Sequence, residues 1–317
     1  MLRQYLQLFR IHTASLTIPA VVIGYLLATN SPSPLYIFLI SIYALLFHGF
    51  GFLWNNIFDL PYDKEDPYKK HFPLVIGSIS FKKTKKIAIF GTASTFIYGL
   101  LLFNNNIIAI IFFILAILFG FLYNIFNKKY IHAIIYISLS FTFLSLSPFV
   151  NFHSLNHIAF GYGTFTFITM VFQNGISGFI KDMKVNQKNT LMHLGTYLEN
   201  DYLHIGAVTL LYAYVIRFLI LVVGLLLSNT LFTFLLFAMV QLFVIILTFM
   251  MLKEGDFNRD HRVKLMSLIE VLNYYSLAII MIDYTTWVWV LFLFIFPIIY
   301  FIIMNKILWG TTIYPKV

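Results

Sequence analysis

The chain has 317 residues and a mean hydropathy of +0.87, with 60% of its residues hydrophobic and only 10% charged. A soluble domain carries about 25% charged residues, so this chain cannot cover a water-facing surface. It contains no cysteine, which excludes disulfides, thiolate catalysis and cysteine-bound metals. The net charge of +9 indicates loops facing anionic lipid headgroups. We expect membrane lipid as a partner and no nucleic acid.

Ten apolar segments follow one another along the chain. Each is long enough, or nearly so, to cross about 30 Å of hydrocarbon as a helix. Their apolar runs are continuous rather than alternating with period two, which favours helices over a barrel. The sequence predicts an all-α, polytopic transmembrane helical bundle in a single domain over residues 1–317. The segments lie at residues 13–29, 35–54, 87–103, 107–126, 131–150, 158–180, 204–228, 231–252, 265–283 and 286–305.

The links between these segments alternate in length and charge. All but one of the 21 Lys and Arg residues lie in the N-terminus, the longer links or the tail. The short links carry none, and this asymmetry follows the positive-inside rule. We therefore expect an integral, multi-pass protein of the cell membrane with both termini and the longer loops on the cytoplasmic side. Arg3 and Arg10 precede the first segment as in a signal peptide, but we favour an uncleaved first helix.

The first long loop begins with oxygen-bearing side chains at four-residue spacing. Asn55, Asp59 and Asp63 share one face if the segment is helical. Pro61 predicts a kink or an end of the helix near Leu60, so that Asp63 could belong to the following loop. Mg²⁺ binds through one or two carboxylates plus substrate phosphates, which this cluster would suit. The alternative is a solvated acidic loop neutralised by nearby lysines.

The second long loop repeats the pattern in a weaker form. Asp182 and Asn186 are again four residues apart, but one carboxylate and one amide make a poorer metal site than two carboxylates. The alternative is a cytoplasmic loop with ordinary charges. The two loops follow the second and sixth segments, one in each half of the chain. That placement suggests two pseudo-symmetric halves around a central cavity.

Together these loops resemble the UbiA superfamily of intramembrane prenyltransferases, over roughly residues 10 to 283. The family has an Asn-x-x-x-Asp-x-x-x-Asp motif after its second helix, a Lys-Asp motif after its sixth, and further short stretches between and beyond them. In this sequence the matching residues are Asn55, Asp59 and Asp63, then Pro73-Leu74 with Gly77, Tyr123 with Lys128, Lys181-Asp182, and Thr190-Leu191 with Leu194-Gly195.

The resemblance implies a Mg²⁺-dependent transfer of an isoprenyl chain from an allylic diphosphate to a lipophilic or aromatic acceptor. It implies nine helices, so we expect nine to ten here. Within the site, it implies catalytic roles for Asp59, Asp63, Asp182 and Tyr123, diphosphate binding by Arg10, Lys69, Lys128 and Lys181, and metal ligands at Asn55, Asp59, Asp63, Asp182 and Asn186.

Three positions depart from the family pattern. Asn56 stands where many members have Asp, and Phe72 where many have Arg. Asn186 replaces the second acidic residue of the second motif, which puts a second Mg²⁺ in doubt. Arg217 and Glu270 lie inside apolar segments, where a charge must be paired or face a cavity. His48 is the histidine closest in sequence to the first motif.

Three functions remain open. An aromatic quinone precursor is the commonest acceptor in the family, and a glycerol-phosphate lipid is possible. A terpene cyclase or a catalytically altered member would share the ionisation chemistry and is favoured by the weaker second motif. A transporter would suit the two intramembrane charges. However, the predicted polar clusters sit at cytoplasmic helix ends rather than at mid-membrane.

Overall fold

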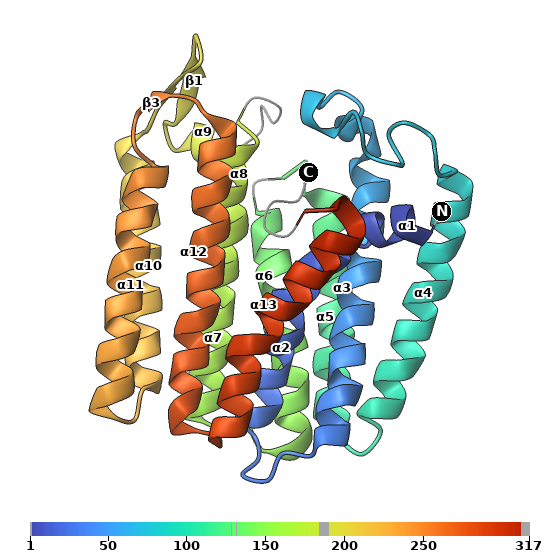
Figure 1. Cartoon of the computed structure of the whole chain (residues 1–317), viewed down its shortest axis with the longest axis vertical. Helices are drawn as coiled ribbons and strands as arrows, with labels where there is room; N and C mark the ends of the chain where they lie inside the picture. Colours follow the sequence, from blue (N-terminus) through green and yellow to red (C-terminus); the bar gives the residue numbers. More distant parts are fainter. Residues whose placement is uncertain (1, 128, 131, 184–189, 312–317) are drawn as a thin grey trace.

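The computed structural model describes residues 2–127, 129–130, 132–183 and 190–311, and it is a bundle of long helices (Figure 1). The helices of two turns or more are α1 Leu2–Leu8, α2 Ala14–Leu26, α3 Pro34–Asp63, α4 Phe81–Leu102, α5 Ile107–Phe126, α6 Ala133–Phe152, α7 His157–Phe172, α10 Ala207–Leu227, α11 Leu231–Met251, α12 Arg259–Ile280 and α13 Trp287–Trp309.

Every predicted apolar segment coincides with one of these helices, so the all-α membrane bundle is confirmed. Within the described residues, eight helices are long and apolar enough to cross a membrane, or nine with the bent run from α1 into α2. That run turns by 53° next to Arg10. α7 is short alone, but it continues through a π-helical turn, Gln173–Ser177, into α8, Gly178–Lys181.

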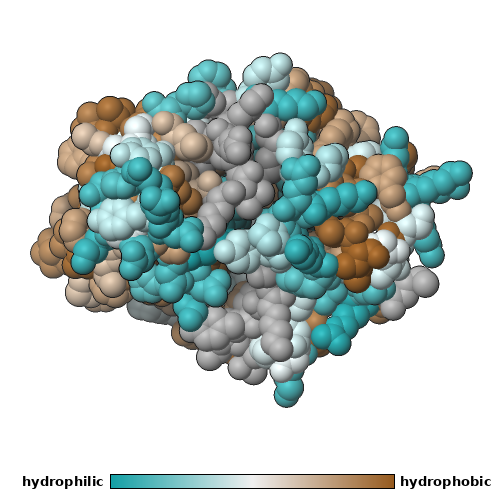
Figure 2. All heavy atoms as spheres, turned by 90° about the horizontal axis from the view of Figure 1, so that it is seen from above, coloured by the Kyte–Doolittle hydropathy of each residue, from teal (hydrophilic) through white to brown (hydrophobic). Residues whose placement is uncertain are grey.

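The helices run alternately up and down, so the connections gather at two ends (Figure 1). The long links, α1 and the end of α13 lie at the upper end of that view, and the short links lie at the lower end. This arrangement places the N-terminal helix and the end of α13 at the same end of the bundle as the long links. Figure 2 looks onto the long-link end, where hydrophilic residues gather and hydrophobic side chains lie towards the rim.

The polar residues of the short links begin the next helix. The side chains of Ser33, Asn106, Asn156 and Thr230 each accept a hydrogen bond from a backbone N–H in the first turn that follows. The first N–H groups of a helix have no partner inside it, so such caps stabilise the helix start. The short links therefore owe their composition to capping.

A small antiparallel sheet lies at the long-link end, and the sequence analysis did not predict it. β1 Tyr197–Glu199 pairs with β2 Tyr202–His204, which pairs in turn with β3 Gly255–Asp256. The turn between β1 and β2 places Asn200 and Asp201 at positive φ, 48° and 63°, a conformation typical of two-residue hairpins. The sheet joins the link after α8 to the link before α12.

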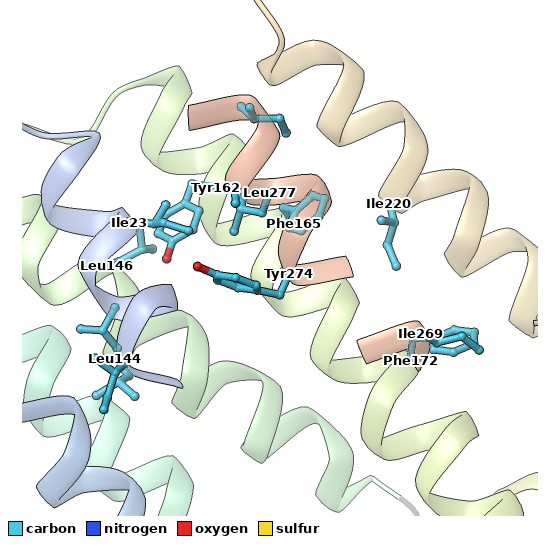
Figure 3. Close-up of a cluster of buried hydrophobic side chains, with 14 of the residues drawn as sticks. Ile23, Leu144, Leu146, Tyr162, Phe165, Phe172, Ile220, Ile269, Tyr274 and Leu277 are labelled. Carbon is cyan, nitrogen blue, oxygen red and sulfur yellow. The ribbon is translucent and has the colours of Figure 1, made fainter. Parts of the chain in front are cut away.

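The core lies between α2, α6, α7, α10 and α12, whose apolar side chains interdigitate in Figure 3. Among them, Tyr162 and Phe172 of α7 and Ile269 of α12 are fully or almost fully buried. α2 and α6 approach closely at Gly24, where an added Cβ would lie 2.0 Å from the carbonyl oxygen of Ser145. Small residues at such crossings let helices pack in lipid, where no hydrophobic effect drives them together.

Candidate active site

A cavity of about 370 Å³ lies between the two halves of the bundle. Its lining comes from α2, α3, α5, α6, α7, α8 and α12, together with Arg10 and Lys69. Charged side chains line one part of it, uncharged polar side chains another, and apolar side chains the remainder. A central cavity is what the pseudo-symmetric arrangement predicts.

α3 carries the first motif into this cavity. Asn55 and Asp59 border it, and Asp59 is 5% exposed. The helix does not end near Leu60, so that expectation is wrong: α3 is helical to Asp63 despite Pro61. Proline removes only the hydrogen bond to the residue four positions earlier, and the helix ends within one turn of it. The three motif residues therefore lie on one helix at the predicted spacing.

Asp63 does not border the cavity but lies beside it. Its Oδ1 accepts a hydrogen bond from Nζ of Lys69 at 2.6 Å, and both belong to one salt bridge. The neighbouring Asp66 begins the short 3₁₀ helix Pro67–Lys69, because its Oδ1 accepts from the backbone N–H of Tyr68 at 2.9 Å. The loop after α3 is thus folded back so that Lys69 reaches both Asp63 and the cavity.

The second motif reaches the same cavity from the other half. Lys181 is the last residue of α8, and Asp182 follows it at the helix C-cap. Both border the cavity. Asn186 lies outside the described residues, as does Lys128. The structure thus brings together Asn55, Asp59, Lys181 and Asp182, although the two motifs are far apart in sequence.

Tyr123 of α5 lies between the two motifs. Its side chain borders the cavity and is within electrostatic range of Asp59, Asp182 and Arg10. One tyrosine thus lies near a carboxylate from each motif. The predicted site residues that the structure describes therefore gather at one end of the cavity, with Asp63 just behind them.

Positive charge surrounds Lys181. Asp182 raises the pKa of Lys181. Burial and the charges of Arg10, Lys69 and Arg259 together lower it by more, so the pKa of Lys181 lies below its ordinary value. The sequence analysis missed Arg259, whose guanidinium lies 4.1 Å from the ring centre of Tyr68. Crowded cations whose repulsion lowers a lysine pKa form a binding site for a polyanion.

Arg10 occupies a strained backbone position that buried side chains hold. Its φ of 46° is left-handed, which is uncommon for a residue with a Cβ. His48 bonds to the carbonyl of Arg10 at 3.2 Å through Nε2 and to Thr17 at 2.8 Å through Nδ1. Asn56 accepts from the guanidinium at 3.4 Å and donates to the carbonyl of Leu8 at 2.7 Å. His48 and Asn56 therefore hold the turn that directs Arg10.

The donor set suits a cation that also binds a phosphate. No group of three or more His, Cys, Asp or Glu side chains among the described residues is arranged to hold a metal alone. Asp59, Asp182 and the amide of Asn55 border one cavity among cations. Mg²⁺ takes one or two carboxylates and completes its shell with substrate phosphates and water, so these residues fit it.

Deeper in the cavity lie polar side chains that the sequence analysis passed over, apart from Glu270. Gln173 and Asn174 come from the π-helical turn, and Asn273 lies one turn after Glu270 on α12. Nε2 of Gln173 donates to Oε2 of Glu270 at 2.8 Å. The signal was present in the sequence, since Thr169 and Gln173 are polar and four residues apart inside an apolar segment.

A second, apolar cavity of about 90 Å³ adjoins the first. It lies between α3, α4, α5 and α6, and aromatic side chains such as Phe47, Trp54 and Phe121 line it. His48, Phe52, Tyr123, Ile137 and Phe141 border both cavities. The polar site therefore shares a wall with an aromatic, apolar compartment.

Comparisons with known proteins identify the fold. The chain resembles the solved structure of a UbiA homolog from Aeropyrum pernix K1 with a TM-score of 0.67 and 15% identity, covering 86% of this chain and 98% of that one. It resembles a digeranylgeranylglyceryl phosphate synthase with a TM-score of 0.64 and 20% identity, covering 89% and 97%. A UbiA homolog from Archaeoglobus fulgidus bound to GPP and Mg²⁺ gives 0.63 and 16%, covering 87% and 99%.

A search of curated proteins finds no match to this sequence. The model of the UbiA prenyltransferase family, by contrast, matches residues 17–269, which include both motifs and the helices that carry them. The chain is an integral membrane protein and belongs to the UbiA prenyltransferase family.

Proposed function

We propose that this protein transfers an isoprenyl chain from an allylic diphosphate to a membrane-associated acceptor, with Mg²⁺ as cofactor. The observation that carries the proposal is the convergence of Asp59, Asp182, Arg10 and Lys181 on one cavity that adjoins an apolar, aromatic compartment. An allylic diphosphate has the same two parts, an anionic head and an apolar tail. The relative from Archaeoglobus fulgidus was solved with GPP and Mg²⁺.

In this proposal Arg10, Lys69 and Lys181 bind the diphosphate and stabilise the charge that grows on it as the carbon–oxygen bond breaks. We also propose diphosphate binding by Lys128 and metal binding by Asn186, which both lie outside the described residues. Asn55, Asp59, Asp63 and Asp182 would hold Mg²⁺, with Asp63 exchanging its pairing with Lys69. Bound Mg²⁺ supplies Lewis-acid neutralisation of the leaving diphosphate. Tyr123 borders both cavities, so it would lie beside the carbon that becomes electron-poor.

The aromatic compartment would hold the isoprenyl tail and keep water from the reacting carbon. Phe47 and Trp54 of α3 and Phe121 of α5 line it, and the rings of Trp54 and Phe121 are in contact. Excluding water prevents hydrolysis of an allylic cation before the acceptor reacts. The observation that favours transfer over transport is that the charged motif residues gather at one end of the cavity, beside an aromatic compartment, whereas transporter sites lie near the middle of the membrane.

The acceptor that we propose first is an aromatic quinone precursor, and a glycerol-phosphate lipid is the second candidate. The second is favoured by the similarity to a digeranylgeranylglyceryl phosphate synthase. An assay with purified protein, Mg²⁺ and a panel of allylic diphosphates tests the proposal. Diphosphate release that requires an acceptor supports transfer. Release with a cyclic hydrocarbon as product indicates a terpene cyclase, and no turnover with any diphosphate contradicts the proposal.

We also propose that the motif loops face the cytoplasm. The natural chain has no cysteine, so a single introduced cysteine reports its own side of the membrane. Ser154 and Ser78 are both exposed and lie on links at opposite ends of the bundle. A membrane-impermeant thiol reagent applied to intact cells should label Ser154→Cys and leave Ser78→Cys unlabelled. The reverse pattern contradicts this orientation.

A further inference from the structure

A second polar group lies deeper in the cavity than the charged site residues. We call it the deep polar group. It consists of Thr169 of α7, Gln173 of the π-turn that follows, and Glu270 and Asn273 of α12. Residues three or four apart share a helix face, so each pair looks into the cavity from one helix. From the helical rise, Gln173 lies about 12 Å along the helix from Lys181. The deep polar group is therefore separate from the anion-binding end.

Three atoms of this group lack a hydrogen-bond partner among the described residues. They are Oε1 of Gln173, Oγ1 of Thr169 and Nδ2 of Asn273, and all three atoms are buried. Asn273 itself is 1% exposed, yet it borders the cavity. Buried polar atoms are almost always hydrogen-bonded, so unpartnered atoms around one cavity indicate the place of a polar ligand. The π-turn that presents Gln173 is a distortion frequently found at functional sites.

Arg217 sets the orientation of the Asn273 amide. This buried arginine of α10 donates from NH1 to Oδ1 of Asn273 at 3.0 Å and from Nε to Oγ1 of Thr248 at 3.0 Å. A guanidinium has donors only, so the carbonyl side of Asn273 must face it. The NH₂ of Asn273 then remains as the donor for the cavity. The intramembrane arginine thus has a positioning role.

Resting on the proposed transfer function, we propose that the deep polar group binds the hydroxyl of the acceptor. A hydroxyl both donates and accepts, which complements the Glu270 carboxylate and the Asn273 NH₂. The shared chemistry is a hydroxyl, from either a phenol or a lipid alcohol.

This binding mode also favours the reaction. A hydroxyl that donates to a carboxylate becomes more electron-rich at its oxygen and, in a phenol, at the ring carbons. That oxygen or ring carbon forms its bond to the allylic carbon as the carbon–oxygen bond to the diphosphate breaks, and the proton that the acceptor loses passes to the Glu270 carboxylate or to the departing diphosphate. Glu270 lies within electrostatic range of Lys181, which places the acceptor site next to the diphosphate site rather than remote from it. The carbon to be attacked would lie between the two.

The test compares acceptors with and without a free hydroxyl. The probes are 4-hydroxybenzoate, a glycerol phosphate monoether with one free hydroxyl, and the O-methyl form of each. We expect wild type to bind the hydroxyl form of one probe at least tenfold more tightly than its O-methyl form. Which probe shows the preference distinguishes a phenol from a lipid alcohol as the source of the hydroxyl.

The variants are Glu270→Gln and Thr169→Val, which keep size and shape. Glu270→Gln should abolish the preference for the hydroxyl form and lower kcat/KM for the acceptor by about 10- to 100-fold, as expected for losing one hydrogen bond to a charged group. The KM of the allylic diphosphate should stay within about twofold. The matched control is Glu199→Gln, an exposed carboxylate outside both cavities.

Equal binding of hydroxyl and O-methyl probes, or a Glu270→Gln protein with wild-type acceptor parameters, overturns this inference while leaving transfer intact. Failure of the transfer function looks different, because wild type would then release no diphosphate with any acceptor. In that case equilibrium binding still tests the deep polar group. A preference for hydroxyl probes that is lost in Glu270→Gln supports a hydroxyl site there, and equal binding of both probe forms by wild type overturns the inference.

Discussion

The two acidic motifs border one cavity from helices of very different regularity. Asp59 lies within α3, which has 30 residues and a capped N-terminus. Asp182 lies at the end of α8, which has 4 residues and follows a π-helical turn. Both motifs reach a helix C-terminus, because Asp63 of the first motif is the last residue of α3. The two motifs therefore differ in the regularity of the helix that presents them.

This difference has a consequence for ligand binding. The position of Asp59 is fixed by a regular helix and by packing on both sides, so it forms a rigid wall of the site. Asp182 lies where the chain leaves the helix, and its backbone there is in neither α nor β conformation, at φ −97° and ψ 10°. We therefore expect the first motif to define the site and the second motif to adjust to the bound substrate.

Asp59→Ala tests the rigid side and should have the largest effect. We expect kcat to fall by about 100- to 1000-fold, the range for removing one group that stabilises transition-state charge. The measurement is diphosphate release with saturating Mg²⁺ and acceptor. Glu65→Ala removes an exposed carboxylate six residues away and serves as the matched control. An active Asp59→Ala protein would contradict the proposed function at its centre.

Asp182→Ala tests the adjustable side and should cost less, about 10- to 100-fold in kcat, because this half of the site already lacks one carboxylate. The same assay measures it. If kcat falls as far as in Asp59→Ala, the two motifs contribute equally to catalysis, and the proposed difference between a rigid first motif and an adjustable second motif is wrong. If Asp182→Ala behaves as wild type, the site operates on the first motif alone.

Gly51→Leu extends the test along α3 into the apolar compartment. Gly51 borders the aromatic cavity, and a Cβ added there would meet nothing within 4 Å. A leucine side chain should occupy space meant for the isoprenyl tail. We expect kcat/KM for the longest donor to fall by about tenfold relative to the shortest, a size typical of discrimination by apolar pockets. Gly51→Ala is the control, and an unchanged length preference would place the tail elsewhere.

Much of this architecture follows from local patterns in the sequence. Continuous apolar runs and the placement of Lys and Arg predict the helices. The four-residue spacing of Asn55, Asp59 and Asp63 predicts that these residues share one face of α3. The helix through Pro61 was missed because a proline near a helix end costs little once tertiary contacts hold the last turn. Phe72 stands where many family members have Arg, and its side chain is buried, at 5% exposed.

The cavity-facing position of the deeper polar residues could not be predicted, for a different physical reason. Polar residues at helical spacing, such as Thr169 and Gln173, can be read from the sequence, but only packing decides whether such side chains face lipid, another helix or a cavity. Arg259 begins α12 and is far in sequence from Tyr68, although its guanidinium lies over the Tyr68 ring. The hairpin of β1 and β2 has strands of 3 residues each, too short for a periodic signal.

The smallest expected effect belongs to Asn186→Asp, which would restore to the second motif the carboxylate that the first motif has. Asn186 lies outside the described residues, so this prediction depends on the four-residue spacing from Asp182 alone. A carboxylate beside a cation in a site of low dielectric attracts it more strongly than an amide does. The variant should therefore need less Mg²⁺, with the half-saturating concentration about two- to tenfold lower and kcat nearly unchanged.

Rate measured against Mg²⁺ concentration, at fixed donor and acceptor, tests this for Asn186→Asp, Asn186→Ala and wild type. Asn186→Ala should move the half-saturating concentration upward, because it removes the amide oxygen. If both variants follow the wild-type curve, the residue does not contribute to metal binding, and Asp182 is then the whole of the second motif. A lower Mg²⁺ requirement in Asn186→Asp would instead mean that the second motif binds the metal weakly because it lacks a second carboxylate, and not because it lies at a helix end.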